Sequence, residues 1–437
     1  MSDHPQVAKE GEERAEPAAR ITREPRIIGR AEHSISRKHI PENVLKVLYR
    51  LQRSGYRAYL CGGSVRDLLL GRTPKDFDVA TNAKPGELRR LFRNSRIIGR
   101  RFRLVHVVFQ DRFVEVSTFR REPEGQSDGD DLLVRRDNTF GNPVEDALRR
   151  DFTINGLFYN IDDFTVIDYA GGIDDLEARL IRVIGDPDVR FREDPVRMMR
   201  AVEFAARLDF EIEADTYDAI LRHREEILKA SPVRVTEEIL ELLRRGWSYE
   251  AMNLILETGL AGVLFPELVP IVEREDFAYF WKMLAVLDRT MRSGKEIPDA
   301  VLVGVLLVPL VFEHLDREEG RRGERLRVGE VLPLIREILE PFFLRLALPG
   351  GMRHQIEQAF ETIWRLLEPP GDRRSRWRFA FREHFDNGML LFELYSFSSG
   401  RYLDTFRAWQ DLLKRVKRED PPEPKRRMRR RKKRRVS

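Results

Sequence analysis

The sequence is almost without cysteine, since Cys61 is the only one among 437 residues. One thiol can form neither an internal disulfide nor a zinc cluster, which suits a reducing compartment. Long apolar runs are also missing: residues 301–312 form the longest, which is too short to span a bilayer, and they contain Pro309. This run predicts a buried helix. The first twenty residues have no apolar segment of the kind found in secretory signals. We therefore expect a cytoplasmic protein without membrane association.

Net positive charge is absent from the body of the chain and concentrated at its end. Residues 414–437 hold fourteen basic and three acidic side chains, a net of +11, and since the whole chain carries +5 the remainder carries −6. Such a block typically stays disordered and binds polyanions such as RNA. A solubilising tail and a nuclear-import signal have a similar composition, so both remain alternatives.

Apolar periodicity is absent from residues 1–38, which are rich in Glu, Arg, Ala and Pro and are expected to be disordered. Order should begin near Ile40 with a helix whose apolar face ends before Gly55. A further short helix is expected at 64–70, and residues 121–131 predict a loop. Runs rich in β-branched and aromatic residues predict strands at 56–62, 77–81, 104–109 and 113–119.

Strand patterns stop after Asp188, and helical periodicity takes over. A charged loop is expected at 316–325. The predicted fold class is therefore an α+β unit followed by an all-α half. Helices are expected at 197–208, 235–243, 249–260 and 277–291.

The segment Leu60-Cys61-Gly62-Gly63-Ser64-Val65-Arg66-Asp67 has the parts of a phosphate-binding turn. Gly62 and Gly63 let the backbone turn sharply and approach a ligand. Ser64 opens the expected helix, where free N–H groups favour phosphate oxygens, and Arg66 can add a bidentate contact. An ordinary strand-to-helix turn is the alternative.

Asp76 and Asp78 follow soon after this turn and strengthen the phosphate interpretation. On a strand, residues i and i+2 point to the same face, so the two carboxylates converge and repel unless cations neutralise them. Mg²⁺ prefers carboxylate and phosphate oxygens, and a pair of ions suits nucleotidyl transfer. The alternative is a solvated turn.

A third acidic ligand is expected, and two residues compete for the role. Glu115 lies in the apolar strand 113–119, where burial without a partner would be costly. Asp151 lies in Arg149-Arg150-Asp151-Phe152-Thr153-Ile154-Asn155, where an Arg–Asp ion pair is the alternative. The sequence leaves this choice open.

Five motifs in this order resemble the class II tRNA nucleotidyltransferase and bacterial poly(A) polymerase family, within the polymerase-β-like superfamily. They are the Gly-Gly-Ser-Val-Arg-Asp turn, Asp76-Phe77-Asp78, Glu115 to Arg120, Arg149 to Asn155, and Arg192-Glu193-Asp194-Pro195-Val196-Arg197 through Ala201. The resemblance runs from about Ile40 to about Pro266. It implies a palm-like head, helical neck and body domains, and template-independent, metal-dependent nucleotide addition to RNA 3′ ends.

By position, the resemblance assigns a role to each motif. Asp76 and Asp78 would hold two Mg²⁺, with Glu115 or Asp151 completing the catalytic carboxylates, and Arg150 with Asp151 would contact the ribose. Asp194 and Arg197 match the family's base-reading pair and, at i and i+3, would share a helix face. A carboxylate and a guanidinium suit adenine and cytosine alike. Asp194 as a helix cap before Pro195 is the alternative. Residues implied to bind the nucleotide are Gly62, Gly63, Ser64, Arg66, Arg150, Asp194 and Arg197.

Two features resemble the poly(A) polymerase branch: the stretch from Ile97 to Val107 and the arginine-rich end. This implies transfer of AMP from ATP to RNA 3′ ends of mRNA and other transcripts, with pyrophosphate released. We expect a monomer that works with the RNA-decay machinery. The alternatives are a CCA-adding or A-adding tRNA nucleotidyltransferase and, more remotely, a non-catalytic RNA-binding protein.

The resemblance also divides the chain. We expect a disordered extension at 1–38, a nucleotidyltransferase head at 39–185, a helical neck that binds base and RNA at 186–275, a helical body at 276–415 and a disordered basic tail at 416–437. The eight histidines include no His-Asp dipeptide, so an appended metal phosphohydrolase domain is not expected.

Overall fold

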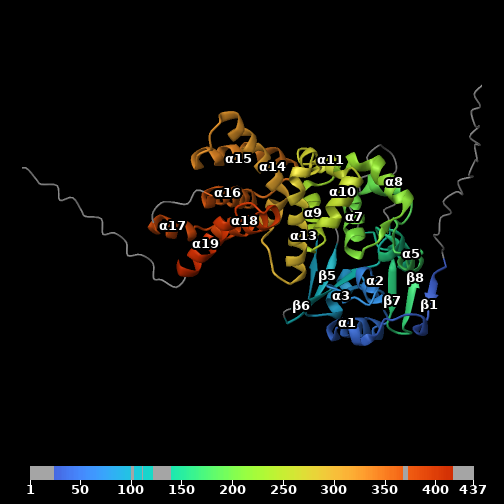
Figure 1. The fold of residues 1–437 in the computed structure, drawn as a ribbon. Helices are drawn as coiled ribbons and strands as arrows, with labels where there is room; N and C mark the ends of the chain where they lie inside the picture. The colour runs from blue at the N-terminus through green and yellow to red at the C-terminus, as the bar shows by residue number, and fades with distance from the viewer. Residues whose placement is uncertain (1–23, 100–102, 111, 122–138, 368–372, 417–437) are drawn as a thin grey trace, which may run out of the picture. The chain divides into compact units, whose positions relative to one another are not determined.

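The computed structural model describes residues 24–99, 103–110, 112–121, 139–367 and 373–416. These residues form two compact units that divide between Lys229 and Ala230 (Figure 1). The first unit mixes strands and helices, and the second is helical. The predicted fold class, an α+β unit followed by a mainly helical half, is confirmed. None of the described helices is long and apolar enough to cross a membrane.

The first unit is built on an eight-stranded sheet of order β1-β8-β7-β2-β3-β6-β5-β4. Neighbouring strands are antiparallel except β3 and β6, which are parallel. The strands are β1 (Arg26–Ile28), β2 (Ala58–Cys61), β3 (Asp78–Thr81), β4 (Ser95–Ile98), β5 (Leu104–Phe109), β6 (Arg112–Thr118), β7 (Leu157–Asn160) and β8 (Thr165–Asp168). A separate parallel pair joins β9 (Leu180–Ile181) to β10 (Glu211–Ile212).

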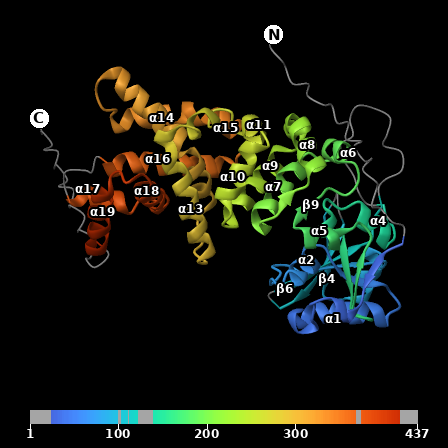
Figure 2. The same ribbon diagram turned by 45° about the vertical axis from the view of Figure 1, so that its right-hand side comes forward.

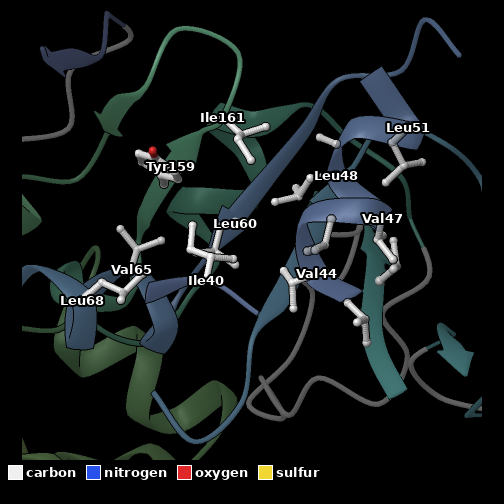
Figure 3. Packing of buried hydrophobic residues seen from close by; sticks show 14 of the residues in the cluster. Ile40, Val44, Val47, Leu48, Leu51, Leu60, Val65, Leu68, Tyr159 and Ile161 are labelled. Atoms are coloured by element: carbon white, nitrogen blue, oxygen red, sulfur yellow. The ribbon is translucent and has the colours of Figure 1, made fainter. Parts of the chain in front are cut away.

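The main core lies on one face of this sheet. Helix α1 (Glu42–Arg53) turns Val44, Val47, Leu48 and Leu51 inward, as its apolar periodicity requires (Figure 3). These side chains pack with residues from alternate positions of the strands, such as Leu60 of β2. Because successive residues of a strand point to opposite faces, the residues between these positions lie on the other face. That face carries a second, smaller apolar cluster that includes Cys61 and Phe158.

The remaining helices of the first unit are short, apart from α7. They are α2 (Gly63–Leu69), α3 (Pro85–Leu91), α4 (Pro143–Leu148), α5 (Gly172–Ala178), α6 (Pro187–Glu193), α7 (Val196–Leu208) and α8 (Ala214–His223).

In the second unit, α14 is the buried apolar helix that the sequence predicts. Residues 300–312 of this helix are all buried, including Pro309. Helix α16 packs against α15 and α18, and Figure 2 shows this unit from a second side. The helices are α9 (Pro232–Arg244), α10 (Ser248–Glu257), α11 (Leu260–Leu264), α12 (Val269–Val272), α13 (Ala278–Arg292), α14 (Asp299–Arg322), α15 (Val328–Arg345), α16 (Gly350–Leu367), α17 (Arg373–Ala380), α18 (Phe385–Ser399) and α19 (Leu403–Val416).

Three sequence expectations about secondary structure are wrong. Strands do not stop after Asp188, because β10 lies at Glu211–Ile212 and pairs with β9. Disorder over residues 1–38 does not hold for residues 24–38, because β1 pairs with β8 and Ile35 is fully buried. The charged loop at 316–325 is instead the end of α14, which continues to Arg322. Its charges are spaced to form ion pairs along one helix face, such as Arg322 with Glu318, and the helix stops at Gly323, whose φ is +71°. Residues 122–131 of the predicted loop lie outside the described residues.

Candidate active site

The glycine turn after β2 requires glycine at position 62. Gly62 has a φ of +66°, a conformation that other residues rarely adopt. A Cβ atom there would lie 2.8 Å from Nη1 of Arg150. The Gly62 N–H donates to the carbonyl of Leu157 on β7, which fixes the turn to the sheet. Helix α2 starts at Gly63, and the buried Ser64 hydroxyl donates to the Cys61 carbonyl at 2.9 Å. The turn thus holds the Gly62 backbone against the guanidinium of Arg150.

A row of side chains crosses the sheet beside this turn. Asp78 on β3 pairs with Cys61 on β2 and with Glu115 on β6. Glu115 pairs in turn with His106 on β5, and His106 with Arg96 on β4. Directly paired residues point to the same face of a sheet. The sheet register therefore places the carboxylates of Asp78 and Glu115 next to each other, although 37 positions separate them in the sequence.

The carboxylates repel one another. Burial, together with repulsion from Glu115 and Asp76, outweighs the attraction of Arg150 and raises the pKa of Asp78 to about 6. Asp76 is exposed and lies two residues before β3, whereas Asp78 is the first residue of the strand. The two carboxylates therefore do not both lie on the strand, contrary to the sequence prediction. A bound cation would relieve the repulsion between these neighbouring carboxylates.

Oxygen ligands of this kind fit Mg²⁺. Within the described ranges, no three His, Cys, Asp or Glu side chains are grouped to hold one ion. Mg²⁺ commonly uses one or two carboxylates and takes its remaining ligands from water and substrate phosphates. The residues present match that pattern rather than an all-protein cage.

Glu115 and Asp151 have different surroundings. The Glu115 carboxylate is about one-third exposed and has His106 Nε2 at 3.3 Å. Asp151 is engaged on both oxygens: Oδ2 accepts from Arg200 at 2.9 and 2.6 Å, and Oδ1 accepts from the Phe152 N–H and the Asn155 amide. Burial alone would raise its pKa, but Arg200 and these hydrogen bonds lower it to about 2. The ion pair expected as an alternative is present, with Arg200 rather than a neighbouring arginine.

Arg66 is buried and held on several sides. Its Nη1 donates to Asn155 at 2.6 Å, its Nε donates to Asp67 at 2.8 Å, and its guanidinium lies 5.0 Å from the ring centre of Phe204. Only 2% of the residue is exposed. The sequence predicted a phosphate ligand here, and the structure shows a guanidinium whose position is fixed by protein contacts.

Asp146 is a site residue that the sequence analysis missed. Its carboxylate is fully buried and accepts from the Arg120 N–H, from Arg149 and, at 2.9 Å, from Nη2 of Arg150. Burial opposes its charge, but Arg150 and Arg149 lower its pKa below the usual value. Asp146 therefore holds Arg150 under the Gly62 turn. The spacing of i to i+3 and i+4 between Asp146 and the two arginines was the available signal.

The expected base-reading pair does not share a helix. Asp194 follows α6 with a non-helical φ of −148°, and α7 begins only at Val196. Pro195 already has helical φ and ψ, so Asp194 lies immediately before the helix of Arg197 and still acts electrostatically on Arg197. Nη1 of Arg197 donates to the Arg190 carbonyl at 2.8 Å and to Glu193. The Asp194 backbone carbonyl accepts from the Arg197 N–H at 3.0 Å.

The sequence of this chain matches two family models and several relatives. Residues 58–182 match a family model described as the poly A polymerase head domain, and residues 209–271 match one described as a probable RNA- and SrmB-binding site of polymerase A. The chain is 42% identical to Poly(A) polymerase I of Salmonella typhimurium over 82% of its own length and 78% of that protein. It is 41% identical to a CCA-adding enzyme of Geobacillus thermodenitrificans over 56% of its length and 60% of that protein.

A solved structure supports the same fold. The CCA-adding enzyme of Bacillus stearothermophilus in complex with CTP superimposes with a TM-score of 0.58, covering 86% of this chain and 82% of that one at 24% identity.

Proposed function

Because this chain belongs to the bacterial poly(A) polymerase family and is an adenylyltransferase, we propose that it adds AMP from ATP to RNA 3′ ends without a template and releases pyrophosphate. The observation that carries the proposal is the row that sets Asp78 beside Glu115, next to the Gly62 turn and Arg150. A nucleotidyltransferase needs acidic ligands and a phosphate-binding turn together, and these residues supply both. The relatives point to adenylate as the group transferred.

Each group of site residues has its own role in this proposal. Asp76 and Asp78 would hold two Mg²⁺, which when bound would neutralise phosphate charge and activate the attacking hydroxyl. Glu115 is our choice for the third catalytic carboxylate, because it faces Asp78 while both oxygens of Asp151 are engaged. The Gly62–Ser64 turn and Arg66 would bind the triphosphate.

Asp151 keeps a further role in the proposal, since with Arg150 it would position the ribose of the nucleotide. The predicted head (39–185), neck (186–275), body (276–415) and basic tail (416–437), a monomeric state, a cytoplasmic location and partnership with RNA-decay machinery are parts of the same proposal.

A CCA-adding activity is the second candidate, favoured by the 41% identity to a CCA-adding enzyme. A non-catalytic RNA-binding protein is disfavoured, because it would keep the repulsion at Asp78 for no purpose. The deciding experiment extends a labelled unstructured RNA with each NTP separately, beside a tRNA that lacks its 3′ end. We expect long extension of the unstructured RNA with ATP alone. Addition confined to the tRNA, with CTP followed by ATP, would contradict the proposal.

Replacing Arg197 should relax base choice more than it weakens triphosphate binding. Arg197→Ala removes the guanidinium proposed to read the base edge, and such a contact is worth about 1–3 kcal/mol of discrimination. We expect GTP and UTP incorporation to rise by about tenfold relative to ATP. The control is Arg192→Ala, an exposed arginine of α6. Unchanged rejection of GTP and UTP by Arg197→Ala would remove the base-reading role.

Removing the basic tail should weaken RNA binding and flatten its salt dependence. Truncation after Val416 deletes most of the +11 block, so fewer counterions are released on binding. Single-nucleotide addition at saturating RNA should persist, since the site residues lie far upstream. RNA Kd measured against salt concentration tests this, with a Lys/Arg→Gln tail of equal length as a control. Equal slopes for parent and truncated chain would favour a solubilising tail.

A further inference from the structure

Beyond Glu115, the same face of the sheet carries an exposed aromatic side chain. Phe113 lies two residues before Glu115 on β6 and therefore points to the same side. More than half of Phe113 is exposed, at 57%. Its ring stacks in parallel on the ring of His106, with 4.0 Å between the ring centres and 9° between the planes. Phe113 and His106 are called the aromatic platform below.

The platform is tied to the catalytic carboxylates. Nε2 of His106 lies 3.3 Å from Oε2 of Glu115, so the ring that supports Phe113 also contacts the carboxylate beside Asp78. Two residues along a strand span about 7 Å. The exposed ring is thus about one nucleoside away from Glu115, on the face where the 3′-hydroxyl must approach.

Exposure alone would say little, because single apolar side chains are common on protein surfaces. Ile97 of β4 is 48% exposed, for example, but it pairs with Val105, which belongs to the buried core face. Phe113 differs because it shares the face of the carboxylates and has a parallel ring beneath it. A flat, half-exposed ring beside a site for RNA ends suits a nucleobase, since every base has a π-face.

The surrounding charge also suits a nucleic acid. Arg96 pairs with His106 across β4 and β5, so it lies on the same face and on the far side of His106 from Glu115. Arg96 is exposed. A cation at this place can meet a backbone phosphate of a strand whose last base lies on the ring.

We propose that the aromatic platform stacks the base of the 3′-terminal nucleotide of the RNA and so positions its hydroxyl at the carboxylates. Phe113 would touch the base, and His106 would hold Phe113 and Glu115 in register. This inference rests on the proposed function, since it names the acceptor subsite of the same reaction. Stacking is tolerant of base identity, which suits an enzyme that extends varied transcripts.

The test compares Phe113→Ala and Phe113→Trp with the parent chain. We expect Phe113→Ala to raise the KM for a short unstructured RNA about tenfold, which corresponds to about 1.4 kcal/mol and lies within the range for base–aromatic stacking. The KM for ATP should stay within twofold. Phe113→Trp should keep the parent KM for RNA, because it retains a ring. Ile97→Ala is the matched control for loss of an exposed apolar side chain of the same sheet, on β4, and it should change neither KM.

A modified RNA tests the stacking contact itself. An RNA with an abasic 3′-terminal residue should bind the parent about tenfold more weakly than the intact RNA, and Phe113→Ala should bind the two RNAs alike. The same RNAs in an anisotropy titration give Kd without turnover, so failure of AMP incorporation would overturn the proposed function and leave the platform testable. Equal KM and Kd for RNA in Phe113→Ala and parent would overturn the platform. Equal increases in the KM for RNA and ATP, with a lowered Tm, would show a structural role and would also overturn it.

Discussion

Asp78→Asn should abolish nucleotide incorporation while leaving the fold intact. The carboxylate is proposed to hold Mg²⁺, and loss of a key electrostatic stabiliser costs ~10³-fold or more in rate. Asp76→Asn should behave in the same way. Incorporation of AMP into labelled RNA at saturating ATP and RNA measures the effect. Retention of more than a tenth of the parent rate would remove both residues from the catalytic assignment.

Asp78→Asn should not lower the thermal stability of the chain, although it should abolish activity. The pKa of Asp78 is about 6 in the folded chain, above the usual value near 4 for an aspartate. A raised acid pKa means that the ionised group opposes folding, fully above pH 6, and the penalty declines as the pH falls from 6 and is gone near the unfolded pKa of about 4. In metal-free buffer at pH 7.5, Asp78→Asn should therefore melt at the parent temperature or higher. Asp162→Asn, an exposed residue after β7, is the control and should change neither rate nor Tm.

Asp146→Asn should destabilise the first unit by about 3–5 kcal/mol. The substitution keeps the shape of the side chain but leaves Arg150 and Arg149 without the buried carboxylate that both contact. It also sets an amide group against their N–H donors. Urea denaturation at pH 7 measures the loss, again with Asp162→Asn as the control. A loss below about 1 kcal/mol would show that the two arginines find other partners.

The pH dependence of this loss follows from the lowered pKa of Asp146. Its stabilising contribution is complete above the unfolded pKa near 4 and disappears as the pH falls through the lower folded pKa. The difference between parent and Asp146→Asn should therefore shrink in acid. Activity should fall as well, because Arg150 lies against Gly62. A constant difference between pH 7 and pH 3 would indicate that the loss comes from packing rather than charge.

Much of the fold could be predicted from local sequence patterns. The strand at 104–109, the helix at the glycine turn and the buried helix around Pro309 are confirmed, because each depends on residues close together in the chain. The edge strand β1 was not predicted, since it is only three residues long and is stabilised by pairing with β8, about 140 positions away. Strands β4, β7 and β8, each four residues long, were also not predicted.

The sequence by itself determined which chemical groups the site contains: the glycine turn, the paired aspartates and the candidates for a third carboxylate. Their partners were decided only by tertiary structure. The parallel register of β3 and β6 sets Glu115 beside Asp78, and an arginine 49 positions away engages Asp151. The non-helical backbone of Asp194 places it just before the helix of Arg197 rather than within it. Each of these outcomes depends on pairing between distant segments or on where a helix ends, and neither sheet register nor burial can be read from spacing along one segment.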